Sequence, residues 1–369
     1  MRNDMYLDNK IIKEDMESIY NRDIDWTVLD GKTIFVSGAY GMITSYIVYF
    51  FMYLNIQYGI NVRVIAQGRN REKAFQRFYE IWEQKGFEFS NVDICKLMKI
   101  DGKIDYIIHG AGVANPRLYS TNPVEVMEPN LLGTYYLLKL AVEKKCDSFL
   151  LFSTGDIYGT VDDPSNIDET TVGKMDPLDI HSCYGESKRV AETLCASFTR
   201  EYDIRTNMAR IGHTYGPTMD VKSDPRVFAS FLRCAVESQD IVMQSDGRAK
   251  RPFCYLADAV FAYLLILLKG KEGEAYNVCN TEQFFSVKEL ADIVASIPDN
   301  KLSVVFKARN DEYVENKLNS YNKPIETKLK ELGWTCKFDL KEGMTRTYQV
   351  LKENIYEKVN RGVNENANM

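Results

Sequence analysis

Short apolar runs alternate with longer helical stretches along the first part of the chain. The runs typical of β-strands lie at residues 32–37, 61–66, 104–108, 148–152 and 205–211. The stretches between them have helical periodicity, at residues 41–57, 70–84, 124–144 and 182–201. Because a helix between two strands returns the chain to the same end of a sheet, this alternation favours parallel strands. The pattern predicts an α/β fold built on a doubly wound parallel sheet.

The pattern becomes more mixed after residue 212, which predicts a smaller C-terminal mixed α/β lobe over residues 212–358. Helices are expected there at 286–296, 325–331 and 340–353. The main domain is expected at 31–211, with part of 251–280 returning to it, an N-terminal extension at 1–30 and a flexible tail at 359–369. The extension is acidic and amphipathic, so its simplest interpretation is a solvated helix packed on the surface.

Composition narrows the class of protein. The 369 residues carry a net charge of −6, and 45% of them are hydrophobic. This is typical of a globular chain, and the acidic balance argues against bulk attraction to nucleic acid or an anionic membrane. No apolar run reaches the ~20 residues that a membrane span needs, and the first ten residues lack the apolar core of a signal peptide. We therefore expect a cytoplasmic protein without a membrane or nucleic-acid partner.

The cysteines and histidines do not indicate a disulfide framework or a metal site. Eight cysteines are present without a C-x-x-C pair, and only three histidines accompany them. Their scatter over expected helices and strands favours reduced thiols. No metal is expected.

A glycine-containing turn, SGAYGMIT (37–44), joins the first expected strand to the first helix. Gly38 and Gly41 permit a tight turn and close approach of the backbone to a pyrophosphate, and the helix start offers free N–H groups. Thr44 stands where a third glycine is usual, which departs from the strict pattern. The strand before the turn and the apolar helix after it favour a dinucleotide-binding (Rossmann) domain over a purely structural turn.

The second strand ends in AQGRN (66–70), without the acid that meets the ribose 2′-hydroxyl in NAD-binding folds. Arg69 would instead meet a 2′-phosphate. This favours NADP, or acceptance of both NAD and NADP. The alternative is that Arg69 only caps a surface loop.

Tyr184 and Lys188 are four residues apart in an expected helix, so they share one face of it. A phenol with a pKa of about 10 is a poor base at neutral pH, and a neighbouring ammonium is expected to lower that pKa. Tyr184 would then take a proton from a substrate hydroxyl while hydride leaves the same carbon for a nicotinamide. The alternative is a chance pair on a helix surface.

A second candidate element, STGDIYG (153–159), directly follows the strand at 148–152. A hydroxyl at the carboxyl end of a sheet strand is placed to hydrogen-bond the reacting oxygen, and Thr154 is the candidate. The alternative is an ordinary turn capped by Ser153 and Thr154.

Together these segments resemble the extended short-chain dehydrogenase/reductase family, in its nucleotide-sugar epimerase, dehydratase and decarboxylase branch. UDP-glucuronate decarboxylases and dTDP-glucose 4,6-dehydratases are the members that the chain resembles most. The resemblance spans about residues 31–350. Its other segments are IIHGAG (107–112), NPVEVMEPNLLGTYYLLKLA (122–141), CYGESKRVAETLC (183–195), ARIGHTYGP (209–217) and RPFCYLADA (251–259).

The resemblance implies a role for each matching residue. Tyr184 would be the catalytic base, Lys188 its partner and a ligand of the nicotinamide ribose, and Thr154 the hydroxyl that shares the substrate O4 proton. The lobe over 212–358 would bind a nucleotide-diphosphate sugar. The binding residues that it implies are Gly38, Gly41, Met42 and Ile43 at the cofactor pyrophosphate, Asp93 at adenine, Ala111 along the cofactor cleft, and Arg226 and Arg251 at the substrate diphosphate.

Two departures from the family pattern bear on the reaction. Gly155 and Asp156 follow Thr154, where the dehydratases carry Asp-Glu and the decarboxylases typically Ser-Glu. Gly155 cannot donate a proton, so half of the elimination pair is missing, while Asp156 keeps a shorter carboxylate. His213 replaces an asparagine near the diphosphate, as a group that titrates near pH 6.5 or as a plain hydrogen-bonding substitute.

Three functions remain open at this point. The first is an NAD(P)-dependent nucleotide-sugar-modifying enzyme of the epimerase, dehydratase or decarboxylase type, which oxidises sugar C4 with a tightly held cofactor and is assisted by Asp156. The second is an NADPH-dependent net reductase of a nucleotide-linked keto-sugar or ketose. The third is a non-catalytic Rossmann binding protein, which the intact Thr154, Tyr184 and Lys188 argue against.

A homodimer is also expected. Family members usually dimerise through the two helices that match 124–144 and 182–201. Both helices carry more apolar positions than one sheet face would cover: Leu131, Tyr135, Leu138, Val190, Leu194 and Phe198.

Overall fold

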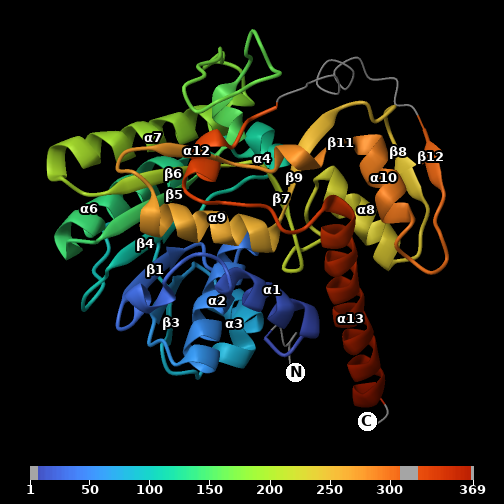
Figure 1. Ribbon diagram of the computed structural model, residues 1–369, viewed down its shortest axis with the longest axis horizontal. Helices are drawn as coiled ribbons and strands as arrows, with labels where there is room; N and C mark the ends of the chain where they lie inside the picture. Colours follow the sequence, from blue (N-terminus) through green and yellow to red (C-terminus); the bar gives the residue numbers. More distant parts are fainter. Residues whose placement is uncertain (1–6, 308–322, 367–369) are drawn as a thin grey trace.

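The computed structural model describes residues 7–307 and 323–366, with side chains as far as residue 354. Seven parallel strands form the main sheet, in the order β10-β6-β5-β4-β1-β2-β3 (Figure 1). The strand order reverses between β1 and β4, which is the point where open α/β sheets bind their ligands. The strands are β1 Thr33–Ser37, β2 Arg63–Gln67, β3 Phe87–Ser90, β4 Tyr106–His109, β5 Ser148–Thr154, β6 Thr206–Ile211 and β10 Ala275–Val278.

Helices cover both faces of this sheet, as the alternating pattern predicts. Helices α2 (Met42–Tyr58) and α9 (Leu256–Lys269) pack on one face, and α6 (Thr134–Lys144) and α7 (Ser182–Tyr202) pack on the other (Figure 1). Side chains alternate along each strand between these two cores, because successive residues of a strand point to opposite faces. The predicted doubly wound α/β fold is therefore confirmed.

A smaller lobe of mixed structure stands beside the carboxyl ends of the sheet. It contains a three-stranded sheet in the order β11-β9-β7 and a parallel pair of β8 and β12. Its elements are β7 His213–Tyr215, α8 Val227–Val236, β8 Ile241–Met243, β9 Lys250–Tyr255, η5 Thr281–Gln283, β11 Phe284–Ser286, α10 Val287–Ala295, β12 Val304–Phe306, α12 Thr327–Glu331 and α13 Leu340–Asn366. Between β9 and β11 the chain returns to the main sheet with α9 and β10. The exact domain limits stay a prediction.

The N-terminal extension corrects one expectation. Helix α1 (Lys10–Tyr20) does not lie solvated on the surface, because Ile12, Asp15, Met16 and Ile19 are fully buried. It packs against α9 (Figure 1), and the turn η1 (Trp26–Leu29) follows it. The extension is therefore part of the core.

Several elements differ from those the sequence predicts. Strand β3, helix α8 and helix α9 were not expected; α9 is apolar on all sides and buried from Leu256 to Leu267, so it lacks the amphipathic pattern. The helix expected at 70–84 ends early, as α3 (Arg71–Phe78) and the turn η2 (Tyr79–Ile81). The helix expected at 124–144 is α5 (Pro123–Glu128), a π-helical turn η3 (Pro129–Gly133) and then α6. The tail expected at 359–369 lies partly in α13 and partly outside the described residues.

No helix in the described ranges is long and apolar enough to cross a membrane. All eight cysteines are free thiols.

Candidate active site

A cleft of about 1540 Å³ runs along the carboxyl ends of the main sheet and under the smaller lobe. It collects most of the residues that the sequence singles out. Those residues are Gly41, Met42, Ile43, Thr154, Asp156, Tyr184, Lys188, His213, Arg226 and Arg251. Gly38 and Ala111 lie directly behind the wall of the cleft, while Arg69 and Asp93 are not among its lining residues.

The turn between β1 and α2 has the geometry of a phosphate cradle. Gly38 has φ +62°, and a Cβ on it would lie 2.7 Å from the Cα of Ala111, so only glycine fits. Gly41 caps α2 without any side-chain hydrogen bond among the described residues, which leaves the first N–H groups of the helix for an anion. These residues therefore fit the pyrophosphate of a dinucleotide.

Thr44 replaces the third glycine of the strict pattern without disturbing this turn. Its hydroxyl donates to the carbonyl of Gly38 at 2.6 Å. Its methyl group takes the space that a side chain on Gly110 would need, since a Cβ there would lie 2.3 Å from Thr44 Cγ2. Close packing at this point is therefore permitted by Gly110, directly after β4, and not by a glycine in α2.

The end of β2 shows where the usual acid is missing. Gln67 is buried and points inward: its Oε1 accepts from the N–H of Gly38 at 3.1 Å and its Nε2 donates to Val92 O at 2.5 Å. Arg69 follows as an exposed residue. Asp93 is half-buried, and its carboxylate accepts from the N–H of Cys95 at 3.0 Å.

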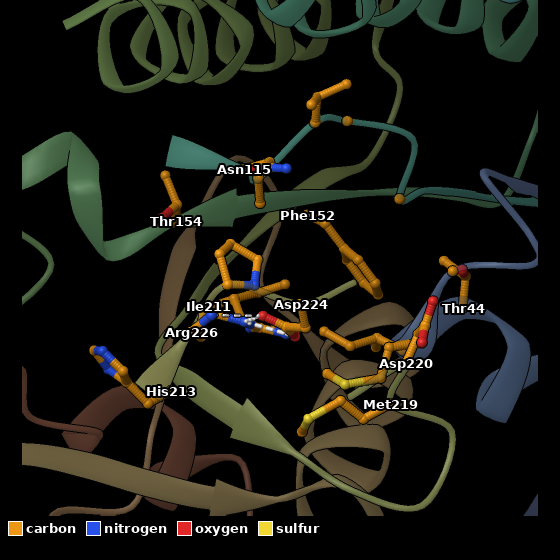
Figure 2. Close-up of a pocket in the computed structure, with 18 of the residues that line it drawn as sticks. Thr44, Asn115, Phe152, Thr154, Ile211, His213, Met219, Asp220, Asp224 and Arg226 are labelled. Atoms are coloured by element: carbon orange, nitrogen blue, oxygen red, sulfur yellow. Dashed lines mark hydrogen bonds and ion pairs between the residues drawn. The ribbon is translucent and has the colours of Figure 1, made fainter. Parts of the chain in front are cut away.

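A loop of the smaller lobe closes over the phosphate turn. The hydroxyl of Thr218 donates to Met42 O at 2.8 Å, and Arg77 Nη2 donates to Thr218 O at 3.2 Å. Met219 and Asp220 of the same loop lie in the cavity near Thr44 (Figure 2). Two lobes therefore form one continuous cleft.

The three predicted catalytic side chains meet at the carboxyl end of β5. Thr154 is the last residue of β5, and its hydroxyl is close enough to the phenol of Tyr184 to lower the pKa of that phenol. The N–H of Asp156 donates to Thr154 Oγ1 at 3.2 Å. Lys188 lies one turn after Tyr184 on α7, with its Nζ 6.0 Å from the centre of the Tyr184 ring. Both Tyr184 and Lys188 are buried.

The effect of Lys188 on the pKa of Tyr184 stays a prediction, and other neighbours also shift this pKa. Burial raises the pKa of Tyr184, the charge of Asp156 raises it further, and the Thr154 hydrogen bond and the Arg226 charge lower it. Lys188 Nζ donates to Phe152 O at 2.6 Å. Burial also lowers the pKa of Lys188 to about 8, because the charged form of a buried lysine loses its hydration.

The substrate side of the cleft holds His213, Arg226 and Arg251. Figure 2 shows His213 and Arg226 projecting into the cavity, and Arg226 joined to Asp224. Burial, with the charges of Arg251 and Arg226, lowers the pKa of His213 to about 3. Of the two alternatives for His213, the lowered pKa favours the plain, uncharged substitute over a group that titrates near pH 6.5.

Gly155 and Asp156 lie beside the Thr154 hydroxyl. A Cβ on Gly155 would touch only Ile211 O, at 3.9 Å, so the missing acid leaves open space rather than a filled wall. Asp156 is exposed to the cleft; its charge adds to the raised pKa of Tyr184 and opposes the lowering of the Arg251 pKa by burial.

Two further residues of the site were given no role from the sequence. Asn130, in the π-helical turn η3, is fully buried; its Nδ2 donates to Ser187 Oγ at 2.9 Å, and its Oδ1 has no hydrogen-bond partner among the described residues. That oxygen points toward Gly112 near Lys188 Nζ. Tyr119, from α4 (Pro116–Thr121), stacks on Tyr184 with ring centres 5.3 Å apart. Each requires contact between distant segments, which no local motif could reveal.

A dinucleotide cradle, a strand-end hydroxyl and a buried Tyr–Lys pair in one cleft define a Rossmann-type oxidoreductase site. The NAD dependent epimerase/dehydratase family matches residues 34–279. The chain belongs to this family of enzymes. The resemblance inferred from its motifs is thereby confirmed.

Curated relatives and solved structures agree with this family. UDP-glucuronic acid decarboxylase 6 of Arabidopsis thaliana is 35% identical over 263 residues, which cover 70% of this chain and 72% of the relative. UDP-glucuronic acid decarboxylase 4 of the same plant is 30% identical over 327 residues, covering 88% of this chain and 69% of the relative. UDP-glucose 4-epimerase of Thermotoga maritima, solved with UDP-glucose, shares the fold with a TM-score of 0.72 at 23% identity, covering 88% of this chain and 99% of that one. The dTDP-glucose 4,6-dehydratase of Bacillus anthracis, solved with NAD, has a TM-score of 0.69 at 18% identity, covering 88% and 97%.

Proposed function

We propose that the chain is an NAD(P)-dependent nucleotide-sugar-modifying enzyme that oxidises the sugar at C4 and then changes C4 or a neighbouring carbon at the same site. The observation that carries this proposal is the meeting of Thr154, Tyr184 and Lys188 in the cleft that also contains the phosphate cradle. A bound nicotinamide would supply the hydride acceptor. Every other requirement falls on side chains of this chain.

Tyr184 is assigned as the base that takes the proton of the C4 hydroxyl. Thr154 accepts a hydrogen bond from the N–H of Asp156, so the single proton of its own hydroxyl is left for Tyr184 or for the substrate oxygen. Arg226 is the cation in this cleft that lowers the pKa of Tyr184. Lys188, fixed to Phe152 O, has further N–H groups for the nicotinamide ribose.

Decarboxylation of a nucleotide-linked uronic acid is the continuation we favour. A C4 ketone is β to a C6 carboxylate, so CO₂ leaves with the C5–C6 bonding electrons passing into a C4–C5 enolate. C5 then takes a proton, for which Asp156 is the candidate acid. The hydride returns to C4, and Tyr184 gives the proton back to O4. This route needs no acid at position 155, whereas 4,6-elimination does; the identity to UDP-glucuronic acid decarboxylases also supports it.

The test is turnover by the protein as purified. Absorbance and fluorescence should reveal bound nicotinamide, and UDP-glucuronate should be converted without added cofactor, with CO₂ released and the product identified by NMR. UDP-glucose and dTDP-glucose serve as parallel substrates that have no carboxylate to lose. Epimerisation of a substrate would replace the favoured continuation, and no turnover of any of them with either cofactor added would contradict the proposal.

A net NADPH-dependent reduction of a nucleotide-linked keto-sugar or ketose is the second candidate. The inward Gln67 and the exposed Arg69 favour it, because no acid at the end of β2 is available for a ribose 2′-hydroxyl and Lys73 lines the nearby cleft. We expect NADP to bind at least as tightly as NAD. A dissociation constant for NAD lower than that for NADP by about tenfold or more would contradict the role of Arg69.

A further inference from the structure

Asp224 and Arg226 form an ion pair with several hydrogen bonds on the substrate side of the cleft. Arg226 Nε lies 2.9 and 3.0 Å from the two carboxylate oxygens of Asp224, and Nη2 lies 2.5 Å from Oδ2. The backbone N–H of Arg226 also donates to Asp224 Oδ1 at 2.9 Å. The carboxylate therefore holds both the main chain and the side chain of the arginine.

The same guanidinium is held from a second direction. Its central carbon lies 4.7 Å from the centre of the Phe228 ring, so its plane rests on an aromatic surface. Asp224 has a side chain that is 12% exposed, whereas that of Arg226 is 38% exposed. The pair thus has a closed side, formed by Asp224, and an open side, formed by the arginine (Figure 2).

The bonding pattern determines which edge of the guanidinium is available. The Nε and Nη2 atoms of Arg226 donate to Asp224, while its Nη1 has no hydrogen-bond partner among the described residues. A guanidinium has five N–H donors in a rigid plane, so fixing the Nε edge also fixes the direction of Nη1. A planar pair of donors suits two oxygens of a phosphate.

We propose that Asp224 is a positioning residue, which orients Arg226 so that its Nη1 edge receives the diphosphate of the nucleotide sugar. This rests on the proposed function. The opposite role is that of a competitor, in which Asp224 neutralises Arg226 and must be displaced by the substrate. The two roles predict opposite changes in affinity when the carboxylate is removed.

The experiment measures binding of UDP and of dTDP to wild type and Asp224→Asn by calorimetry, together with kcat and KM. Asparagine keeps the shape and one acceptor but presents N–H groups to the guanidinium, so Arg226 is no longer fixed. We expect the dissociation constant and KM to rise on the order of tenfold, with kcat changed much less, because misplaced donors weaken binding of the diphosphate before and during reaction.

Asp246→Asn is the matched control. Asp246 and Arg248 have the same spacing in sequence and the same two kinds of contact, with the carboxylate 3.1 Å from the backbone N–H and 2.8 Å from Nε of the arginine. This pair is exposed and lies outside the cleft lining. Its substitution should leave nucleotide binding unchanged.

Arg226→Lys is a second variant, which tests the same contact in case Asp224→Asn weakens binding only by unfolding the loop. Lysine keeps the positive charge and can still pair with Asp224, but it has no second edge of donors. It should weaken nucleotide binding to a similar extent, and the double variant should lose little more than either single one. Thermal unfolding checks that each variant is folded.

Tighter or unchanged nucleotide binding by folded Asp224→Asn, with wild type binding normally, would overturn this inference alone. Fully additive losses in the double variant would overturn it as well. Failure of wild type to bind any nucleotide diphosphate would overturn the proposed function, and this inference with it.

Discussion

At the scale of single residues, the neighbours of Tyr184 determine its chemistry more than its spacing from Lys188 does. The phenol is buried, stacked on Tyr119 and close to Thr154, and burial raises its pKa above the ordinary value. Thr154 and Arg226 are the groups that favour its phenolate. A base in such a place acts only while these neighbours, and a bound cofactor and substrate, are arranged around it.

Replacing Tyr184 by phenylalanine should abolish turnover while leaving cofactor binding intact. The ring and its stacking remain, and only the oxygen that exchanges a proton with the substrate is lost; a general base of this kind is worth at least about 10²–10⁴ in rate. The measurements are kcat/KM for the best nucleotide sugar and the dissociation constant of NAD(P). Tyr136→Phe, on α6 outside the cleft lining, removes a phenol oxygen as a control. Surviving activity in Tyr184→Phe would show that the base is another group.

At the scale of elements, a buried carboxylate joins four segments that are far apart in sequence. Asp15 of α1 accepts from the hydroxyls of Tyr46 on α2 and Tyr255 on β9, at 2.6 and 2.5 Å. Arg346 of α13 pairs with it at 2.7 Å and with the exposed Glu14 at 3.0 Å. The extension thereby connects the main sheet domain to α13, whose Leu351 and Asn354 line the cleft.

The stability of the fold should depend on pH through Asp15. Burial raises the pKa of Asp15 from 3.8 to about 6, although the charge of Arg346 and the two tyrosine hydroxyls oppose this. Between these two values the folded chain binds more protons than the unfolded chain, so the contribution of Asp15 is fullest at low pH and declines as the pH rises through about 6.

Urea unfolding of wild type and Asp15→Asn would measure this contribution. The free energy of unfolding of wild type relative to the variant should fall by about 2–3 kcal/mol between pH 4 and pH 7, because the asparagine does not titrate while the other groups are shared. A difference that stays constant over this range would contradict the raised pKa of Asp15.

At the scale of the whole molecule, the outer face of α6 and α7 is the best candidate for contact with a second copy. Tyr135 and Val190 are 39% and 45% exposed, and Leu132 and Tyr202 are 43% and 48% exposed. Leu138 and Phe198, which were expected on this face, are instead buried against the main sheet. Fewer of the expected side chains are therefore exposed than the sequence suggests, but exposed apolar residues remain on both of these neighbouring helices.

Sedimentation velocity at micromolar concentration should show a dimer. A charge in the middle of this face would be buried without a partner, so Val190→Glu should shift the protein to a monomer. Val28→Glu is the control, since Val28 is 47% exposed in η1, whose Trp26 packs on Phe50 of α2 at the opposite face of the main sheet. A monomeric wild type, or a Val190→Glu variant that stays dimeric, would contradict this interface.

Local patterns in the sequence determined the main sheet, the phosphate turn and the Tyr184–Lys188 pair. Each depends on a rule that the backbone itself imposes. Side chains alternate between the two faces of a strand, residues four apart share one face of a helix, and glycine is favoured where φ is positive. Gly38 and Thr154 could be located for this reason, because one directly follows a predicted strand and the other lies two residues after one.

Only the tertiary structure decided how these parts work together. Gly110 accommodates Thr44, Asp224 holds Arg226 beside Phe228, and Asp15 bonds α1 to the core. The buried side-chain oxygen of Asn130 has no partner in the part of the chain that the structure describes. Such effects depend on burial and on partners from distant segments, and burial changes the cost of a charge or an unpaired polar atom by several kcal/mol. For that reason the sequence could name Tyr184 and His213 as site residues, but the direction in which their pKa values shift follows only from what the folded chain packs around them.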